Sequence, residues 1–297
     1  MAIAITGAAG FVGRHLVWHL LEKGEAVRGL VHDPADGQTL EALGAGWKQG
    51  DVRKPETLRD FVRGADAVVN LVAILREAPA EGQTFSAVNV EGARNVARTC
   101  AQEGVPRLVH VSALGVVANP AFPYADSKWR GEDAVRKEFP AATILRPSLL
   151  AGRGHPAFDV WARQVRSLPL VPVPGDGNVK LQPLDVRDLS ECVRLAATQP
   201  DYARRSIDLG GPEQLTYDQI LDAVMRRLRR KRAKFHLPHS LANFGAGAMA
   251  LLQRKPDVTS GEIDELLRAD HVTSTISVEK HFGFAPRTLD QALEAMF

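Results

Sequence analysis

The chain alternates short apolar runs with stretches in which apolar residues recur every three or four positions. The apolar runs predict buried strands at 2–6 and 67–73, and further strands are predicted at 26–31, 47–51, 107–112 and 142–146. The helical spacing predicts helices between them, from 15 to a stop at Gly24 and at 40–47, 58–62, 88–103 and 127–139. Regular alternation of strand and helix predicts a parallel sheet covered by helices on both faces.

Three glycines separate the first strand from the first helix. Gly7, Gly10 and Gly13 stand three residues apart. In a strand–turn–helix unit they permit a tight turn, close approach of the backbone to a pyrophosphate, and packing of the helix on the strand. The helix N-terminus then offers free N–H groups and partial positive charge to the anion. The alternative is three turn or packing glycines in an ordinary βαβ unit.

The pattern loosens after Pro147. Prolines and glycines interrupt 169–177, helices are predicted at 188–197 and 217–230, and a strand at 206–209. We therefore predict an α/β protein with two parts. Residues 1–150 form a Rossmann-type, doubly wound NAD(P)-binding domain, and residues 151–297 form a smaller, mainly helical substrate or partner region, partly interleaved with the first.

Composition limits the partners and the compartment. The 297 residues are 45% hydrophobic and 24% charged, with a net charge of +2, which gives no argument for nucleic acid. Cys100 and Cys192 have no paired spacing, so a disulfide framework is not expected. No apolar run reaches the roughly 18 residues of a membrane span, and the N-terminus lacks the basic flank of a secretory signal. These features predict a cytoplasmic protein.

A basic run stands out in the second half. Seven of the nine residues from Arg226 to Lys234 are basic. The run is interpreted either as the solvated end of a helix or as a surface for acidic lipid or nucleic acid. The apolar stretch Phe244 to Leu252 is interpreted as a packed helix rather than a membrane contact, since nine residues cannot span a bilayer. Peripheral membrane contact through 226–252 stays an alternative.

Ten short motifs occur in an order that resembles a known family. They are TGAAGFVG (6–13), GDV (50–52), NLVA (70–73), NVEG (89–92), HVSALG (110–115), YADSK (124–128), LRPS (145–148), PLDVRDL (183–189), LGGPEQLTY (209–217) and FGFAPRTL (282–289). The chain resembles the extended or atypical branch of the short-chain dehydrogenase/reductase superfamily. Within it, the chain is most similar to the group of the nucleotide-binding accessory subunit of respiratory complex I and its bacterial epimerase/dehydratase-like relatives.

The resemblance implies a role for each matching residue. Tyr124 would be the acid/base, and Lys128 would bind the nicotinamide ribose and lower the tyrosine pKa. The other implied cofactor contacts lie along the pyrophosphate, adenine and nicotinamide: Gly7, Gly10, Phe11, Val12, Gly13, Asp51, Val52, Leu71, Val72, Ala73, Pro147 and Ser148.

The residues themselves make the tyrosine–lysine pair chemically sensible. Tyr124 and Lys128 are four apart, so on a helix they project from one face. A phenol with a pKa of about 10 is a poor base at neutral pH, and a nearby ammonium favours the phenolate. In isolation the same spacing is also that of an exposed surface pair.

One position departs from the family pattern. Catalytic relatives carry a Ser or Thr hydroxyl just after the serine that ends the fifth strand, and here that position is Ala113. Ser112 is the candidate replacement, but one step along a strand turns a side chain to the opposite face. Loss of one preorganised donor costs on the order of 100-fold in rate. Cofactor binding is thus better supported than turnover.

The end of the second strand bears on cofactor choice. NAD-preferring relatives place an acid there, and ungapped counting puts Val31 at that position. His32 follows, and Arg14 comes directly after the third glycine, where a guanidinium suits a 2′-phosphate. We predict NADP, with NAD as the alternative because Asp33 lies close by.

No metal site is predicted. His15 and His19 share one helical face without a third ligand, and Pro238 separates His236 from His239. Two functions stay open: an oxidoreductase transferring hydride between NAD(P) and a carbonyl or alcohol, or a non-catalytic nucleotide- or partner-binding protein. The substrate is an unidentified small molecule, and the chain is expected to be a monomer or a homodimer.

Overall fold

The computed structural model describes residues 1–238, 240 and 259–297. The predicted helix at 244–252 and His239 therefore lie outside the described residues. The chain divides into two compact units. Unit 1 comprises Met1–Pro147 and Val186–Asp208, and unit 2 comprises Ser148–Asp185 and Leu209–Phe297.

Unit 1 is built on a seven-stranded parallel sheet. The strand order is β11-β6-β5-β4-β1-β2-β3, the doubly wound order of dinucleotide-binding folds. In register, Ile3 of β1 lies between Val27 of β2 and Ala67 of β4. The strands are β1 (Ala2–Thr6), β2 (Ala26–Val31), β3 (Gly46–Gln49), β4 (Ala67–Asn70), β5 (Leu108–Val111), β6 (Thr143–Pro147) and β11 (Ser206–Leu209).

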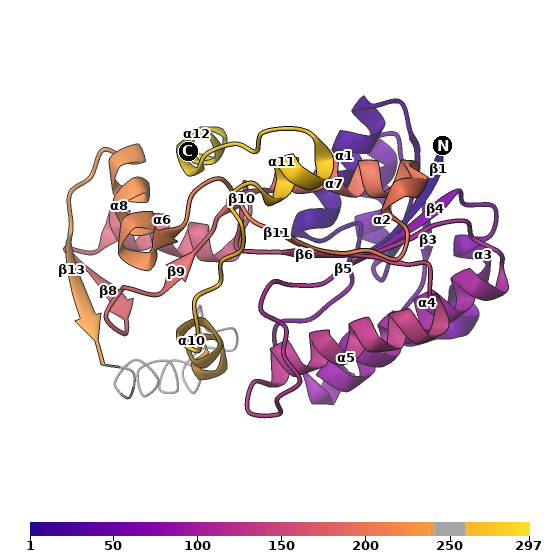
Figure 1. Cartoon of the computed structure of the whole chain (residues 1–297), viewed down its shortest axis with the longest axis horizontal. Helices are drawn as coiled ribbons and strands as arrows, with labels where there is room; N and C mark the ends of the chain where they lie inside the picture. The colour runs from indigo at the N-terminus through magenta and orange to yellow at the C-terminus, as the bar shows by residue number, and fades with distance from the viewer. Residues whose placement is uncertain (239, 241–258) are drawn as a thin grey trace. The chain divides into compact units, whose positions relative to one another are not determined.

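Helices cover both faces of this sheet. Figure 1 shows α1 and α7 on one face, and α4 and α5 on the other. The helical segments of unit 1 are α1 (Phe11–Glu22), α2 (Pro34–Ala42), η1 (Pro55–Thr57), α3 (Arg59–Val62), η2 (Pro79–Glu81), the π-helical η3 (Ser86–Gly92), α4 (Ala93–Gln102), α5 (Pro123–Glu138), α7 (Val186–Thr198) and η4 (Pro200–Tyr202). Between the α4–α5 layer and the sheet lies an apolar core with Phe61, Val96 and Val135 fully buried.

Most predicted elements of unit 1 exist, with shifted ends. Strands 2–6 and 26–31 match β1 and β2. The predicted strand 67–73 ends at Asn70, because its last three residues turn toward the surface. The predicted helix 40–47 was placed too late: α2 starts at Pro34, where the Asp33 carboxylate accepts a hydrogen bond from Ala35 N–H as the N-cap. Helix α5 begins at Pro123, which puts Tyr124 inside it.

Unit 2 has short strand pairs and helices. Its strands are β7 (Leu150–Ala151), β8 (Leu170–Pro174), β9 (Lys180–Leu181), β10 (Leu184–Asp185), β12 (Leu215–Thr216) and β13 (Ala233–Leu237), paired β10–β7, β12–β9 and β13–β8. Its helices are α6 (Pro156–Ser167), α8 (Tyr217–Arg227), α10 (Ser260–Leu267), α11 (Ser277–Phe282) and α12 (Leu289–Met296). The stretch 169–177, which prolines and glycines interrupt, contains strand β8. Phe158, Ile220 and Leu293 anchor a core between α6, α8 and α12.

The glycine turn is constrained by the protein's own backbone at two positions. Gly7 adopts φ +72°, a left-handed conformation that other residues rarely take. A Cβ on Gly13 would lie 2.1 Å from the Gly7 carbonyl oxygen and 2.6 Å from the Ala8 carbonyl. Helix α1 can therefore reach this position beside β1 only because residue 13 has no side chain.

We expect Gly13→Ala to destabilise unit 1 severely, because the backbone of residues 7 and 8 must move to admit the methyl group. The expected loss of unfolding free energy is about 2 kcal/mol or more, as for overpacking in a rigid core. Urea denaturation of the ligand-free protein measures it. Gly46→Ala is the matched control, since the nearest atom to its added Cβ is 3.7 Å away. Equal stability of the two variants would contradict the argument.

Candidate functional site

The glycine turn lies at the crossover point of the sheet. The chain leaves β1 for β2 on one side and reaches β4 on the other, so the loops after β1 and β4 are adjacent. A Cβ on Gly7 would come within 3.3 Å of the Leu71 carbonyl carbon and the Val72 nitrogen. Leu71 N–H also donates to Thr6 O at 3.2 Å. The structure thus brings together the predicted residues of the first turn and those of the loop after β4, where Ala73 is exposed.

Gly10 differs from Gly7 and Gly13, the other two glycines of the turn. Its backbone is extended, at φ −70° and ψ 176°, and an added Cβ would meet only the Gly7 carbonyl oxygen, at 3.3 Å. The fold therefore demands a bare residue here far less strictly than at Gly13. Its bareness leaves open space beside the first turn of α1, which fits the close approach of a phosphate group.

No side chain of α1 itself places a negative charge at the first turn of this helix. Gly10 is the N-cap and provides no side-chain hydrogen bond, and no acidic residue stands in the first turn. The backbone N–H groups of Phe11 and Val12 are among those that an α-helix cannot satisfy internally. Phe11 and Val12 are partly exposed, and Arg14 is exposed one residue after Gly13. This terminus suits a negatively charged group.

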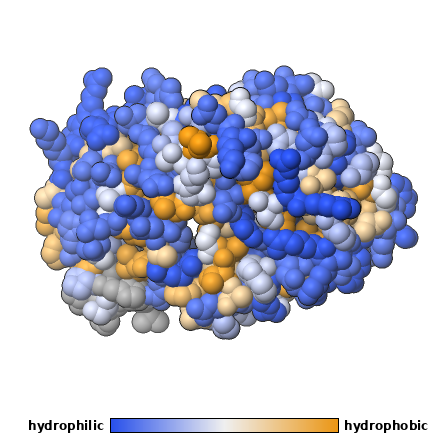
Figure 2. Space-filling model, in the orientation of Figure 1, coloured by the Kyte–Doolittle hydropathy of each residue, from blue (hydrophilic) through white to orange (hydrophobic). Residues whose placement is uncertain are grey.

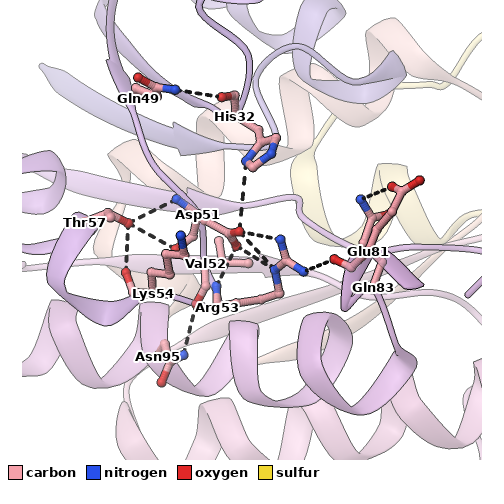
Figure 3. Close-up of polar contacts among 10 residues, drawn as sticks. All are labelled: His32, Gln49, Asp51, Val52, Arg53, Lys54, Thr57, Glu81, Gln83 and Asn95. Atoms are coloured by element: carbon pink, nitrogen blue, oxygen red, sulfur yellow. Dashed lines mark hydrogen bonds and ion pairs between the residues drawn. The ribbon is translucent and has the colours of Figure 1, made fainter. Parts of the chain in front are cut away.

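Asp51 lies after β3, and its carboxylate is already bound by Arg53 (Figure 3). Asp51 Oδ1 accepts from Arg53 N–H at 2.9 Å, and Oδ2 accepts from Arg53 Nη2 at 2.6 Å and Nε at 3.0 Å. Burial alone would raise the pKa of Asp51, but the hydrogen bonds from Arg53 outweigh it and hold the pKa below its usual value. Arg53 Nη1 also donates to Glu81 O at 2.9 Å.

The loop after β3 is rigidly held around this pair. Asp51 N–H donates to Thr57 Oγ1 at 3.0 Å, and Asn95 Nδ2 donates to Val52 O at 3.0 Å, which ties the loop to α4 (Figure 3). Val52 itself is buried in the core. Arg53 was not predicted as a site residue. The sequence signal for Arg53 was its position directly after the GDV motif and two residues after Asp51.

The end of β2 carries no free acid. Val31, at the position of the NAD-type acid, is buried. The Asp33 carboxylate caps α2. The His32 side chain is 79% exposed, and its Nδ1 lies 4.0 Å from Asp51 Oδ2 (Figure 3). Beside the exposed, helix-capping Asp33, this end of the sheet thus presents an imidazole and, from α1, the exposed Arg14 guanidinium.

Helix α5 carries the tyrosine and the lysine. Tyr124 is partly exposed and stacks edge-on against Phe85, with ring centroids 6.2 Å apart. Lys128 is only 3% exposed, and its ammonium donates to Val111 O at 3.0 Å. In the described part of the chain no carboxylate lies within ion-pair distance of Lys128 Nζ. Burial lowers the pKa of Lys128 to about 8, although the charge of Glu132 acts in the opposite direction.

A buried ion pair lies one turn further along α5. Glu132 is fully buried, and its carboxylate accepts from Arg146 Nε at 2.8 Å and Nη2 at 2.6 Å. Burial would raise the pKa of Glu132, but the hydrogen bonds from Arg146 keep it below its usual value. Ser112 Oγ is buried beside this pair, and its hydroxyl, directed at the Glu132 carboxylate, contributes to the lowered pKa of Glu132. Its hydroxyl therefore does not stand in the open position expected of a carbonyl-polarising group.

Asn89 joins three segments of the site and was not assigned a role from the sequence. Its Oδ1 accepts from Ile74 N–H at 2.8 Å, and its Nδ2 donates to Ile74 O at 3.1 Å and to Ser127 Oγ at 2.9 Å. Ser127 Oγ in turn donates to Tyr124 O at 2.7 Å. The π-helical turn of η3 thus fixes the loop after β4 and the first turn of α5 together. The NVEG motif was its signal.

A buried polar chain crosses three strands beneath α5. Thr6 Oγ1 donates to Asn70 Oδ1 at 2.6 Å, and Asn70 Nδ2 lies 3.0 Å from His110 Nδ1. Because the amide nitrogen donates, Nδ1 accepts and the imidazole proton is assigned to Nε2. His110 Nε2 is buried without a partner among the described residues. Burial, assisted by the charge of Lys128, lowers the pKa of His110 to about 3.

The remaining predicted residues lie at the junction between the units in sequence. Pro147 closes β6, is buried, and its carbonyl oxygen accepts from Leu114 N–H at 2.8 Å. Ser148 is the first residue of unit 2, and its hydroxyl donates to His271 O at 3.0 Å. The Ser148 hydroxyl is therefore engaged within its own unit.

Two of the histidines considered as metal ligands form contacts with carboxylates instead. His19 Nε2 lies 2.7 Å from Glu191 Oε2, and His236 Nε2 lies 3.1 Å from Asp218 Oδ1. In the described ranges no three His, Cys, Asp or Glu side chains are grouped to hold a metal ion. Cys100 and Cys192 are separate, buried thiols. Within those same ranges no helix combines the length and the apolar character needed to cross a membrane.

The crossover geometry and the bare glycine turn define the class of Rossmann-type dinucleotide-binding proteins. The chain belongs to the NAD dependent epimerase/dehydratase family, whose model matches residues 3–210. This confirms the resemblance to the extended short-chain dehydrogenase/reductase superfamily.

Similar proteins include subunits of respiratory complex I and reductases. The chain is 26% identical to the mitochondrial NADH-ubiquinone oxidoreductase 40 kDa subunit of Neurospora crassa, over 95% of this chain and 75% of that protein. It is 36% identical to the ceramide reductase of Caulobacter vibrioides, over 51% of this chain and 47% of that protein. The NADPH-dependent quinone oxidoreductase of Escherichia coli, solved with NADPH, has the same fold, with a TM-score of 0.78 at 19% identity and 98% coverage of both chains.

The low pKa of His110 predicts a specific dependence of stability on pH. Below a pH of about 6.5 the unfolded chain protonates this histidine, whereas the folded protein does not until about pH 3. The stabilisation from neutral, buried His110 is therefore fully present above the pKa of the unfolded chain. Within this window the free energy of unfolding decreases by about 1.4 kcal/mol for each unit by which the pH is lowered.

We expect His110→Gln to make the slope of unfolding free energy against pH shallower by about that amount, about 1.4 kcal/mol per pH unit. Urea denaturation at a series of pH values between the folded and unfolded pKa measures the slope. His32→Gln, which replaces a histidine that is 79% exposed, should leave the slope of the wild type unchanged. An identical slope for all three proteins would show that His110 is not buried as a neutral base.

Proposed function

We propose that the protein is an NAD(P)-dependent oxidoreductase that transfers hydride between a nicotinamide cofactor and a carbonyl or alcohol. The observation that carries the proposal is Lys128, one helical turn from Tyr124: its ammonium is buried, and among the described residues a backbone carbonyl is its one hydrogen-bond partner. A cation that is buried without a carboxylate partner costs stability, and such groups concentrate at functional sites.

The cofactor fits the residues that are present. Gly10 leaves space that a Cβ would fill, and the uncapped first turn of α1 offers N–H groups to a diphosphate. Gly7, Gly13, Phe11 and Val12 would border that diphosphate, while Asp51 and Val52 would meet the adenine. Leu71, Val72 and Ala73 would lie beneath the cofactor, and Pro147 and Ser148 beside the nicotinamide. The bound nicotinamide supplies or accepts the hydride.

The chain's own residues would handle the proton. Tyr124 and Lys128 are four residues apart on α5 and project from one face of the helix. The positive charge of Lys128 favours the phenolate of Tyr124, which brings the phenol toward the pKa range useful for proton transfer at neutral pH. Asn89 and Ser127 hold the Tyr124 turn through its carbonyl oxygen. Tyr124 then donates a proton to the nascent alkoxide in reduction, or removes one in oxidation.

The end of β2 favours NADP over NAD. The acid that would accept hydrogen bonds from a ribose 2′-hydroxyl is replaced by buried Val31, and Asp33 is committed as a helix cap. Arg14 and His32 are exposed at the same edge of the sheet, and a guanidinium binds a phosphate dianion well.

A second function is favoured by one observation. Ala113 stands where a carbonyl-polarising hydroxyl is expected, and the nearest candidate, Ser112 Oγ, is buried beside the Glu132–Arg146 pair. A protein that holds the dinucleotide without turnover, structurally or as a redox sensor, would not need that hydroxyl. Several relatives are named as subunits of a larger respiratory enzyme. NADPH binding without NADPH consumption across a substrate panel would favour this second function.

Tyr124→Phe is expected to lower the rate of NADPH oxidation by about 100-fold or more while leaving the Kd for NADPH within about twofold, because it removes a proton donor used in the chemical step. The assay follows NADPH absorbance with a quinone, a long-chain ketone and a nucleotide sugar as probes. Tyr202→Phe, at a tyrosine outside the site, is the control. Equal rates for Tyr124→Phe and the wild type would remove Tyr124 from the mechanism.

Gly10→Ala and Arg14→Ala test the cofactor contacts separately. Gly10→Ala should weaken NADPH and NADH alike by about tenfold or more, since the methyl group occupies space needed by the phosphates. Arg14→Ala should weaken NADPH by about tenfold and leave NADH unchanged, as expected for loss of one charge-assisted contact to the 2′-phosphate. Isothermal titration measures both. Lys23→Ala, a neutralised exposed cation at the far end of α1, is the control.

Wild-type protein that binds NADPH and NADH equally, with no change in Arg14→Ala, would contradict the NADP assignment. Binding of neither nucleotide would contradict the proposed function as a whole. Gly10→Ala protein with unchanged thermal stability but lost nucleotide affinity would localise the defect to the ligand rather than the fold.

A further inference from the structure

The turn between α8 and β13 gathers positive charge. It borders a hollow of about 730 Å³ that is lined by Asp222, Met225, Arg226, Arg229, Arg230, Lys231 and Arg232. Two of these cations have partners: Arg226 lies 3.7 Å from Asp290, and Arg232 Nε donates to Val165 O at 2.9 Å. Only Asp222 provides a carboxylate in the lining, so the hollow is strongly positive.

Three cations of the turn are exposed, and their side chains have no partner in the described ranges. They are Arg229, Arg230 and Lys231. Arg229 adopts φ 52°, a left-handed conformation that is unfavourable for a side chain of this size. This conformation reverses the chain between α8 and β13. The three charges are therefore held together at one corner of unit 2, where their mutual repulsion has no internal compensation.

Strand β13 directs Lys234 toward the carboxylates of α8 and its aromatic residue to the opposite side. Lys234 Nζ forms ion pairs with Asp222 at 2.9 Å and Asp218 at 3.3 Å, and His236 also contacts Asp218. Side chains alternate along a strand, so Phe235 points to the opposite face, where it is 55% exposed. Leu237, on the same side as Phe235, is half-buried against Ile263 of α10, so Ala233 and Phe235 form the exposed part of this side of β13.

Strand β8 extends this exposed apolar face. Val171 and Val173 are fully buried in the core of unit 2, whereas Leu170 is 53% exposed. In the parallel register Leu170 stands opposite Ala233, and Pro172 stands opposite Phe235. We call the surface formed by Leu170, Pro172, Ala233 and Phe235 the β8–β13 outer face. In Figure 2 hydrophobic colouring reaches the surface at β8 and β13, next to blue side chains that project beyond the end of α8.

We propose that the β8–β13 outer face and the adjoining basic turn form a docking surface for an anionic lipid bilayer. Leu170 and Phe235 would enter the interface between headgroups and acyl chains, and Arg229, Arg230 and Lys231 would contact lipid phosphates beside them. Apolar side chains flanked by unpaired cations are the combination that holds peripheral proteins at acidic membranes. This association is independent of the proposed hydride transfer.

Charge and backbone chemistry distinguish a bilayer from the other occupants. Nucleic acid would use the cations but gains little from exposed Leu170. A second copy of the chain that added a strand to the free edge of β8 would need both backbone donors and backbone acceptors there. Gly175 N–H donates to Leu237 O of β13, so the alternating residues Pro172 and Pro174 have their nitrogens on the free edge, where they provide no donor. That edge is therefore a poor partner for strand pairing.

Flotation of the full-length protein with vesicles tests the proposal. Vesicles of phosphatidylcholine mixed with phosphatidylglycerol should bind the protein, and pure phosphatidylcholine should bind it far more weakly. Arg230→Gln/Lys231→Gln should lower the partition coefficient about 25-fold, at about fivefold for each cation. Leu170→Ser/Phe235→Ser should lower it about tenfold or more through lost apolar burial. High salt should weaken binding of the wild type by screening.

Lys23→Gln/Lys280→Gln is the matched control, since it removes two exposed cations elsewhere and should leave vesicle binding unchanged. Each variant should keep the wild-type Tm, because the substituted side chains are exposed. Equal binding to neutral and anionic vesicles, or wild-type binding by both double variants, would overturn the proposal. So would binding to polyuridylate RNA that survives Leu170→Ser/Phe235→Ser without any vesicle binding, or a dimer in light scattering that dissociates on that substitution.

Discussion

The contact between the backbone of α1 and the turn after β1 governs the arrangement of unit 1. Because residue 13 has no side chain, the helix meets the Gly7 and Ala8 carbonyl groups at a distance that a methyl group would prevent. The first turn of α1 is consequently aimed past the carboxyl end of β1, next to the loop after β4. Two unrelated requirements, helix packing and an open anion site, are met at one place in the chain.

Beneath α5 the protein maintains a layer of buried polar groups rather than a purely apolar core. Glu132 is paired there with both Arg146 and Arg136, whereas Lys128 and His110 do not have matching partners among the described residues. The burial that lowers the pKa of Lys128 also lowers that of His110, and the positive charge of the lysine reinforces the effect on the histidine. His110 thus stays neutral in the folded state, and the lysine is the cation of this layer nearest to Tyr124. This division of charge fits a site in which one positive group must act on a phenol.

The sequence supported prediction of the fold more fully than of the site. Strand β1 was predictable to the residue because it is a short apolar run that ends at the glycine turn, and β2 because it follows Gly24 and ends before the turn at Asp33 and Pro34. The start of α5 was missed because Pro123 and Tyr124 show no apolar periodicity, and the helix there is stabilised by proline at its first turn. The motifs around Arg53 and Asn89 marked their positions but not their partners, and His110 had no such interpretation, since Asn89, Arg53 and His110 form hydrogen bonds to residues 15, 28 and 40 positions away. The outward face of β13 was equally hidden, because Lys234 turns inward only through its ion pairs with α8.

The number of residues in the π-helical turn at Ser86–Gly92 determines where Asn89 lies in the site. Such a turn holds one residue more than the α-helix into which it continues. A deletion between Asn89 and α4 would convert the turn to a regular helix and shift Asn89 from the place where it contacts Ile74 and Ser127. The number of residues in this turn is therefore fixed by the contacts that Asn89 makes.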